Sequence, residues 1–416
     1  MIRQIKTRIN GRIDWRQTFT ALRYPNYRLW FWGQMISMFG TWMQATALGF
    51  LIFELTQSPA YLGLVGFANG VPTWLFMLYA GVVADRVSRR RLMVITQTAM
   101  MILAFVTAGL TFFHLIRSWH IIVLAFGFGV TNAFDAPARQ AFVKELVGHE
   151  DMTNAIALNS AMFNTSVALG PAFGGVIYAL FGPAWCFTIN GLSFIAVIAA
   201  LMAMRLEPFI PKAHLNSILS DLKEGLRYVV THSMIRTIVS LVGVISLFGF
   251  AFATLMPAWA VKMLHGNATT NGFLQSARGF GALAAALLIA SLGRFKFRGK
   301  LLTFGSFAFP VLLVVFAFIR WEPLSLLVLF GIGFALILVF NLANAAVQEL
   351  TPDALRGRVM SIYSLVFFGS LPIGSLFIGW MAVKTSEPTT VVINSLIVLT
   401  YSVVLFVFMP KLRKLK

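Results

Sequence analysis

The chain has 416 residues, is 58% hydrophobic with a mean hydropathy of +0.81, and carries 33 Lys and Arg against 14 Asp and Glu. So few charges cannot cover the surfaces of the two or three soluble domains that this length would otherwise form. A net charge of +19 is also typical of nucleic-acid-binding proteins, so the positions of the charges must decide the class. The single cysteine, Cys186, excludes an intramolecular disulfide.

Twelve apolar segments follow one another along the chain. They cover roughly 29–54, 61–84, 92–113, 119–136, 154–180, 184–204, 237–261, 271–292, 301–319, 324–347, 356–382 and 390–409. Each can cross about 30 Å of hydrocarbon as a helix. Helices are required because a backbone in lipid must satisfy its own hydrogen bonds. The short alternating segments of a β-barrel are absent from the sequence. The fold class is therefore an all-α integral membrane protein with twelve transmembrane helices.

The basic residues alternate sharply between the two sets of connections. Of the 33 Lys and Arg, 28 lie in the set that includes both chain ends. The other set carries only Arg117, Lys262, Arg320 and Lys384, and Arg278 lies within an apolar segment. The positive-inside rule then places both termini of this multi-pass membrane protein in the cytoplasm. This placement makes membrane lipid the partner of the positive charge and excludes nucleic acid.

The longest polar stretch between apolar segments covers 205–236. Within it, the apolar residues of 215–230 share one helical face, which predicts an amphipathic helix on the cytoplasmic interface. These residues are Leu215, Ile218, Leu219, Leu222, Leu226 and Val229. The stretch divides the chain into a six-helix bundle with an N-terminal cytoplasmic segment (1–204), a linker (205–236), and a six-helix bundle with a basic tail (237–416).

The two halves resemble each other at a constant offset of 204 residues. KELVGHEDMTNAIALNSAMFNTSVALGPAFGG at 144–175 corresponds to QELTPDALRGRVMSIYSLVFFGSLPIGSLFIG at 348–379. Glu145 then matches Glu349, and Gly170 matches Gly374. Two related bundles predict a pseudo-symmetric transporter with its site between the halves.

Two short motifs contain residues that spanning the membrane alone does not require. In GVVADRVSRRRLM, 81–93, the arginines hold a cytoplasmic turn, whereas an acid so near the membrane, Asp85, needs a partner. Gly81 can admit a close neighbouring helix. In VALGPAFGG, 167–175, three glycines form a face for close helix packing, and Pro171 frees a backbone carbonyl.

These motifs resemble signatures of the major facilitator superfamily. The residues of the first motif, which that family uses as a cytoplasmic latch of the outward-facing state, are Gly81, Asp85, Arg86, Arg89 and Arg90. The residues similar to the antiporter motif, which implies export, are Gly170, Pro171, Gly174 and Gly175. The family usually has glycine where this chain has Ser88. A loop that only sets topology and a merely structural glycine face are the alternatives.

LRYPNYRLWFWGQMISMFGTWMQ, FDAPARQAFVKELV, NAIALNSAMFN and LRGRVMSIYSLVF resemble the enterobactin-exporter-like branch of that superfamily. The branch contains siderophore exporters and drug-efflux relatives of bacterial inner membranes. In facilitator folds the first, fourth, seventh and tenth helices line a central cavity. The resemblance therefore suggests that the polar stripes of helices one and ten line it, with interhelical hydrogen bonding as the alternative. The stripes are Gln34, Ser37, Thr41 and Gln44, and Asn341, Asn344 and Gln348.

Two charged positions inside helices invite functional interpretation. Arg278 can contact an anionic substrate, pair with an acid such as Glu54, or extend to the interface. Asp135 can accept a proton, pair with Arg139, join the turn around Arg86, or cap a helix starting near Pro137. The arginine that the superfamily often carries in helix four is missing here, so its role in proton coupling cannot be transferred.

The resulting hypothesis is a secondary active exporter of a siderophore or drug-like compound, a monomer with proton antiport and rocker-switch alternation. Candidate proton acceptors are Glu54, Asp85 and Asp135. A lysophospholipid transporter and a non-transporting receptor or scaffold are the alternatives. The six histidines are scattered, and the sequence contains neither metal-ligand spacing nor a phosphate-binding loop. Neither an enzyme nor a cofactor is therefore expected.

Overall fold

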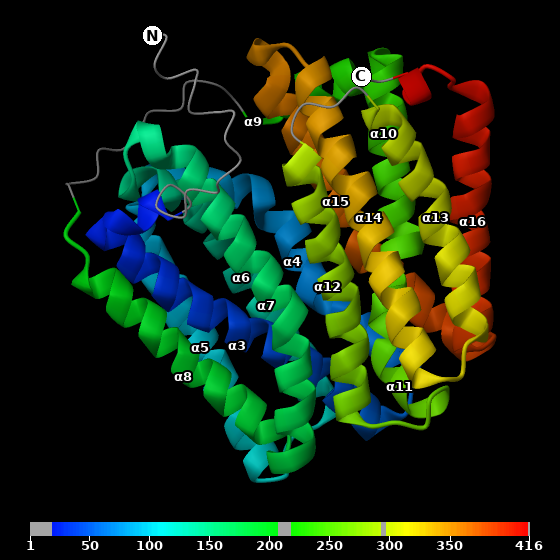
Figure 1. Ribbon diagram of the computed structural model, residues 1–416. Helices are drawn as coiled ribbons and strands as arrows, with labels where there is room; N and C mark the ends of the chain where they lie inside the picture. The colour runs from blue at the N-terminus through cyan, green and yellow to red at the C-terminus, as the bar shows by residue number, and fades with distance from the viewer. Residues whose placement is uncertain (1–18, 207–217, 293–296, 415–416) are drawn as a thin grey trace, which may run out of the picture.

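The computed structural model describes residues 19–206, 218–292 and 297–414, and every regular element in those ranges is a helix (Figure 1). Eleven segments in those ranges are long and apolar enough to cross a membrane. Helix α4, 28 residues long, completes a set of twelve. The prediction of an all-α membrane protein with twelve spanning helices is therefore confirmed.

Six helices form the first bundle. They are α3 (Pro25–Thr56), α4 (Pro59–Arg86), α5 (Arg89–Phe112), α6 (Ser118–Leu146), α7 (Met152–Phe181) and α8 (Pro183–Ala203). Three of them begin on a proline, Pro25, Pro59 or Pro183. The first turn of a helix tolerates proline because its N–H has no intrahelical acceptor there, and the fixed φ angle favours the helix.

The remaining spans form the second bundle. The seventh span consists of α10 (Ser233–Val244), η4 (Ile245–Gly249), η5 (Phe250–Leu255) and α11 (Met256–Lys262). The other five are α12 (Ala268–Leu292), α13 (Arg298–Phe318), α14 (Glu322–Leu350), α15 (Asp353–Lys384) and α16 (Glu387–Phe408). In Figure 1 the first bundle is blue to green and the second is green to red.

The seventh span departs from the continuous helix that its apolar sequence predicts. Its centre is a five-residue π segment, η4, followed by the six-residue 3-10 segment η5. Gly249 lies where the two meet, and a Cβ atom there would stand 2.5 Å from the ring of Phe309. Pro257 then occupies the first turn of α11 and has no N–H to donate. Segments of this kind inside helices frequently mark functional positions.

Helix α6 runs without interruption through Pro137 and ends at Leu146, ten residues beyond the predicted apolar segment. No new helix starts near Pro137, so the interpretation of Asp135 as an N-cap is wrong. Neighbouring helices compensate for the hydrogen bond that an internal proline removes. The carboxylate of Asp135 is thereby available for tertiary contacts.

Each bundle has its own apolar core. The first includes the fully buried side chains of Tyr27, Trp30 and Phe142, and the second those of Phe252 and Phe309. A third cluster combines α3 residues such as Met43 and Phe53 with Ala258 and Ala268 of the second bundle. This third cluster joins the bundles.

A shorter helix, α9 (Ile218–Thr231), precedes the seventh span and packs against α15 and α10. Glu224 forms an ion pair with Arg358 of α15 at 2.5 Å, and a Cβ atom at Gly225 would stand 2.6 Å from the Arg358 carbonyl oxygen. Val229 is buried, whereas Leu226 remains half exposed. One part of the predicted apolar face therefore packs against the protein, and another part remains exposed. Leu215 lies outside the described residues.

The segment around LRYPNYRLW ties the start of α3 to the start of α7 and to the residues that follow α8. The Ala21 N–H donates to Asn154 Oδ1 at 3.0 Å, and the Tyr27 hydroxyl donates to the Ala155 carbonyl at 2.9 Å. Asn26 Nδ2 donates to the Arg205 carbonyl at 2.7 Å and Asn26 Oδ1 accepts from its N–H. These contacts explain why a polar sequence is retained beside an apolar helix.

We expect Tyr27→Phe to lower the free energy of unfolding by about 1 kcal/mol, because the buried Ala155 carbonyl would lose a hydrogen-bond donor. Unfolding in mixed micelles of a mild detergent and dodecyl sulfate measures the change. Tyr61→Phe is the control, because the Tyr61 side chain is exposed. Equal stability of the two variants would contradict the expectation.

Candidate functional site

The two ends of the helical bundles differ in how the bundles meet. The terminal end is defined here as the end where α3 begins and α16 ends, and the distal end is opposite (Figure 1). Helices α4 and α12 run from the distal to the terminal end, while α7 and α15 run the other way. The contacts between bundles are therefore located by position along these four helices.

The first seam joins the distal halves of α4 and α15. A Cβ atom at Gly63 would stand 2.5 Å from the Ser375 carbonyl oxygen, and one at Gly70 would stand 2.3 Å from Pro372. Further along, a Cβ atom at Gly369 would meet Trp74 at 2.5 Å. Only glycine allows the helices to approach this closely.

The second seam joins the distal halves of α7 and α12 and contains the VALGPAFGG motif. A Cβ atom at Gly175 would stand 2.4 Å from the Ala268 carbonyl oxygen, and one at Gly272 would stand 2.5 Å from the Pro171 carbonyl oxygen. The motif's other glycines, Gly170 and Gly174, pack instead against Trp42 and Met43 of α3. The motif therefore serves two interfaces, one within the first bundle and one between bundles.

At the glycines described in the terminal halves of α4 and α15, no comparable close approach is found. Within the described residues, no atom lies within 4 Å of a Cβ atom built at Gly81 on α4 or at Gly357 on α15. The expectation that Gly81 admits a close helix is not met in this conformation. The bundles are thus closed at the distal end and separated near Gly81 and Gly357.

The charged turn makes its recorded contacts inside the first bundle. Arg89 forms an ion pair with Glu145 at the end of α6. Arg90 donates to the carbonyl oxygens of Met202 and Met204 at 2.8 and 3.2 Å, which caps the last turn of α8. Arg86 is exposed, and the side chain of Asp85 lies outside the described part of the chain.

The internal repeat extends to these contacts. Arg298, at the start of α13, forms an ion pair with Glu349 at 2.5 Å, and Glu349 is the repeat equivalent of Glu145. In both bundles, an arginine that begins one membrane-spanning helix therefore contacts an acid near the end of the next membrane-spanning helix. The recurring Glu-Leu dipeptide was the sequence signal for this pair.

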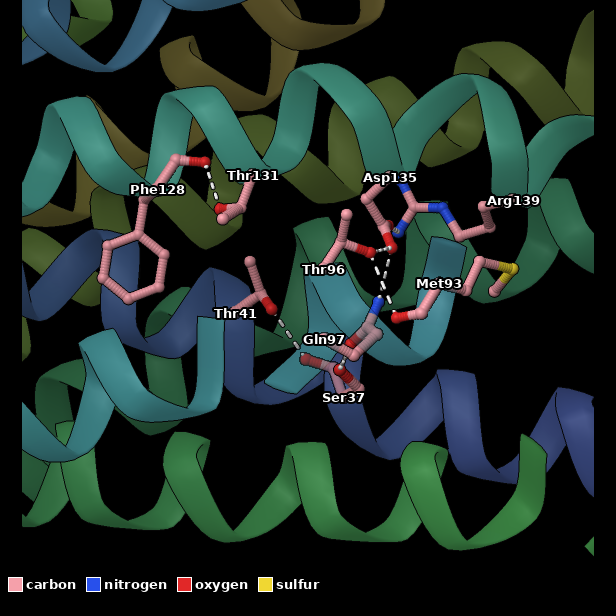
Figure 2. A network of polar contacts seen from close by, with 9 residues as sticks. All are labelled: Ser37, Thr41, Met93, Thr96, Gln97, Phe128, Thr131, Asp135 and Arg139. Atoms are coloured by element: carbon pink, nitrogen blue, oxygen red, sulfur yellow. Dashed lines mark hydrogen bonds and ion pairs between the residues drawn. The ribbon is translucent and has the colours of Figure 1, made fainter. Parts of the chain in front are cut away.

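A buried polar network centres on Asp135 of α6, whose side chain is 1% exposed (Figure 2). Asp135 Oδ1 accepts hydrogen bonds from Thr96 Oγ1 at 2.9 Å and from Gln97 Nε2 at 3.0 Å, both on α5. Arg139 approaches Oδ2 at 3.7 Å, as the ion-pair interpretation proposed. Within the described residues Oδ2 accepts no hydrogen bond.

Asp135 is residue 18 of the 29 in α6, so the network lies well inside the bundle. The Ser37 hydroxyl of α3 extends it with a long hydrogen bond of 3.5 Å to Gln97 Oε1. The sequence interpretation missed Thr96 and Gln97, although they are polar residues in an apolar segment.

The polar stripe of α3 is mostly buried, with Gln34 at 1%, Ser37 at 2% and Gln44 at 4% exposure. Gln44 Oε1 accepts from Asn190 of α8 at 2.7 Å. Thr41 is the exposed member of the stripe. The predicted cavity-lining role therefore does not fit Gln34, Ser37 and Gln44 in this conformation; interhelical packing describes them better.

Arg278 lies in the middle of the second bundle as residue 11 of the 25 in α12. Its guanidinium carbon stands 5.3 Å from the ring centroid of Phe250 in η5. The ring centroids of Phe250 and Phe340 of α14 are 6.2 Å apart, and those of Phe340 and Phe367 of α15 are 4.8 Å apart. We call these four side chains the arginine–phenylalanine cluster.

Two other predicted positions lie close by on α14. Asn341 is exposed beside Phe340, and Asn344 is partly buried and accepts a hydrogen bond from Gln348 Nε2 at 2.5 Å. The Tyr363 hydroxyl of α15 donates to the Phe340 carbonyl oxygen at 3.3 Å. These contacts hold the α14 part of the cluster in place.

The suggested pairing of Arg278 with Glu54 is wrong. Glu54, near the distal end of α3, accepts a hydrogen bond from the Tyr178 hydroxyl of α7. Lys262 of α11 lies above the Phe53 ring at 5.6 Å and forms an ion pair with the buried Glu387 at 2.8 Å. Glu54 therefore belongs to the closed distal end rather than to the arginine–phenylalanine cluster.

Known proteins resemble this chain over most of its length. The family MFS_3, described as transmembrane secretion effector, matches residues 16–416. The staphyloferrin A transporter of Staphylococcus aureus is 26% identical over 84% of this chain and 87% of its own length. The multidrug efflux pump Tap of Mycolicibacterium fortuitum is 27% identical over 90% of this chain and 93% of its own.

The enterobactin exporter EntS of Citrobacter koseri is 23% identical over 98% of this chain and 97% of its own length. Among solved structures, a mutant of the peptide transporter POT superposes with a TM-score of 0.76 at 13% identity, covering 94% of this chain and 95% of that one. At this identity the likeness concerns the fold alone. The chain therefore belongs to the transmembrane secretion effector family MFS_3, in a branch of the major facilitator superfamily that includes siderophore and drug exporters.

Proposed function

We propose that the protein is a secondary active exporter that moves a siderophore or a drug-like compound out of the bacterial cytoplasm. The relatives that carry siderophores or drugs support this substrate class. The bias of Lys and Arg puts the terminal end in the cytoplasm, so the recorded conformation would receive substrate from inside. The protein acts as a monomer in the cytoplasmic membrane.

The observation that carries the mechanism is the one-sided closure of the bundles. The glycine seams hold the distal halves together, while Gly81 and Gly357 at the other end have no close neighbour among the described residues. Rocking the bundles would break these seams and bring the terminal halves together, exposing the site to the other side. The charged turn, with Asp85 and Arg86, would then act as the latch of the outward-facing state.

Asp135 is the proton acceptor in this proposal. It is buried, and within the described residues its Oδ2 atom accepts no hydrogen bond. It contacts α5 through Thr96 and Gln97, and Gln97 extends this network to Ser37 of α3. Protonation would remove its attraction to Arg139 and turn the carboxylate into a donor, which changes the packing of α5 against α6. Proton and substrate shift the equilibrium between the two states only through their different affinities for each.

Proteoliposomes with an imposed proton gradient test the proposal. We expect accumulation of enterobactin, staphyloferrin A or ethidium against its concentration gradient when protons flow in the opposite direction. A gradient of about two pH units supplies roughly 2.7 kcal/mol per proton, or a concentration ratio of about 100 for one-to-one exchange. A collapsed gradient is the control. Flux that ignores the gradient would leave a facilitator, and no flux of any probe would contradict export.

A further inference from the structure

We propose that the arginine–phenylalanine cluster is a subsite for an anionic group of the transported compound, joined to a flat apolar or aromatic body. The inference rests on the proposed function and narrows its substrate class. It starts from the charge of Arg278. Among the described residues no carboxylate lies within ion-pair distance of the guanidinium, and its Nε atom is buried without an acceptor.

An uncompensated charge in a membrane-spanning bundle is expensive. The nearby Phe250 ring offers the guanidinium only the weak attraction of a cation for an aromatic face. A structural arginine would be expected to have an acid or a set of carbonyl oxygens beside it, as Arg320 has those of Ala317 and Ile319. A bound anion would supply the missing acceptor.

The neighbouring residues on α12 point in the same direction. Asn271, Gln275 and Arg278 follow spacings of four and three residues and so share one helical face. The Oδ1 atom of Asn271 accepts a hydrogen bond from Gln275, but its Nδ2 atom has no acceptor within the described residues. The face is therefore rich in donors that lack acceptors, which suits a ligand rich in oxygen acceptors.

The cluster lies at the level of the bundles where a transported ligand would bind. Gly279, next to Arg278, is packed against Ala168 of α7 and forms the contact of that seam nearest to the terminal end. Gly369, next to Phe368, has the same place in the other seam, against Trp74. The cluster thus lies at the level where the closed distal half gives way to the separated terminal half, and there an alternating movement changes its access.

The aromatic side chains define the rest of the ligand. Phe250, Phe340 and Phe367 belong to three different helical elements, and the Phe340 ring forms edge-to-face contacts with each of the other two. Exposed Phe368 and Asn341 border them. Such rings favour a flat apolar group by stacking, while Arg278 binds the charge. The break between η4 and η5 places Phe250 over the guanidinium.

Binding to the purified full-length protein in detergent tests the proposal with three probes that share one ring system: 2-naphthoate, 2-naphthalenemethanol and 2-naphthylmethylammonium. We expect the anion to bind more tightly than the alcohol and the cation not to bind. Arg278→Gln should weaken naphthoate binding by about 10-fold or more, and Arg278→Lys by less, because it retains the charge. Phe250→Leu should weaken it several-fold.

Arg320→Gln is the matched control, since Arg320 also lies over an aromatic ring, that of Trp259, but outside the cluster. Unchanged naphthoate affinity in Arg278→Gln, or equal binding of the cation, would overturn the subsite. Failure of the proposed function would be distinguishable from failure of the subsite. Flux that persists unchanged in Arg278→Gln would reject the subsite alone, and Arg278-dependent binding without any gradient-driven flux would reject export alone.

Discussion

Asp135→Asn is expected to abolish gradient-driven accumulation while leaving the bundle folded. Asparagine has almost the same shape, and its Oδ1 atom can still accept the hydrogen bonds from Thr96 and Gln97. The substitution removes the charge near Arg139 and, with it, the proposed proton acceptor. In proteoliposomes the concentration ratio should fall from about 100 at two pH units towards 1.

Exchange of labelled for unlabelled substrate across the same membrane should continue in Asp135→Asn, because that exchange needs no net proton movement. The control is Asp353→Asn, whose carboxylate at the start of α15 is 86% exposed. It should transport like the unmodified protein. Proton-driven accumulation that survives in Asp135→Asn would move the coupling to another acid, Asp85 or Glu54 being the remaining candidates.

Gly175→Val is expected to drive the bundles apart at the distal end. The valine Cβ atom would stand 2.4 Å from the Ala268 carbonyl oxygen and 3.0 Å from the Thr269 Cα atom, and neither backbone atom can rotate away. Overpacking of this kind costs about 1–3 kcal/mol, which shifts a two-state equilibrium by roughly 5- to 150-fold. Spin-label pairs at the exposed distal positions Phe113 and Trp321 measure the separation.

Two further glycines make the experiment selective. Gly109→Val should leave the distance distribution unchanged, because within the described residues nothing lies within 4 Å of its Cβ position. Gly81→Val is equally unhindered in this conformation but should disfavour the state in which the terminal halves meet. If Gly175→Val and Gly109→Val gave the same distances, the seam between α7 and α12 would not control the distal end.

The arrangement of spans was accessible from sequence because lipid leaves the backbone few choices. Twelve apolar segments long enough to cross a bilayer had to become helices. The boundaries were less accessible near Pro137, where the predicted apolar segment ends at residue 136 but α6 continues to Leu146, because tertiary contacts carry the helix onward. The apolar sequence of the seventh span likewise concealed its break, although Gly249 and Pro257 were visible in it.

The candidate site was only partly predictable because sequence spacing gives a helical face but not the direction in which that face points. Gln34, Ser37 and Gln44 form the expected stripe, yet they are buried within the first bundle, where Ser37 contacts α5 and Gln44 contacts α8. A stripe facing a cavity and a stripe facing a neighbouring helix have the same period. The partners of Asp135, 38 and 39 residues away on α5, required the rotation of both helices.

The mixed winding of the seventh span gives that helix an adjustable length. A 3-10 segment rises about 2.0 Å per residue against about 1.5 Å in an α-helix, so rewinding the six residues of η5 would shorten the span by roughly 3 Å. Phe250 is the first residue of that segment and would move with it. A local change of helical pitch would therefore move the Phe250 ring relative to the Arg278 guanidinium, while the other eleven membrane-spanning helices keep their conformation.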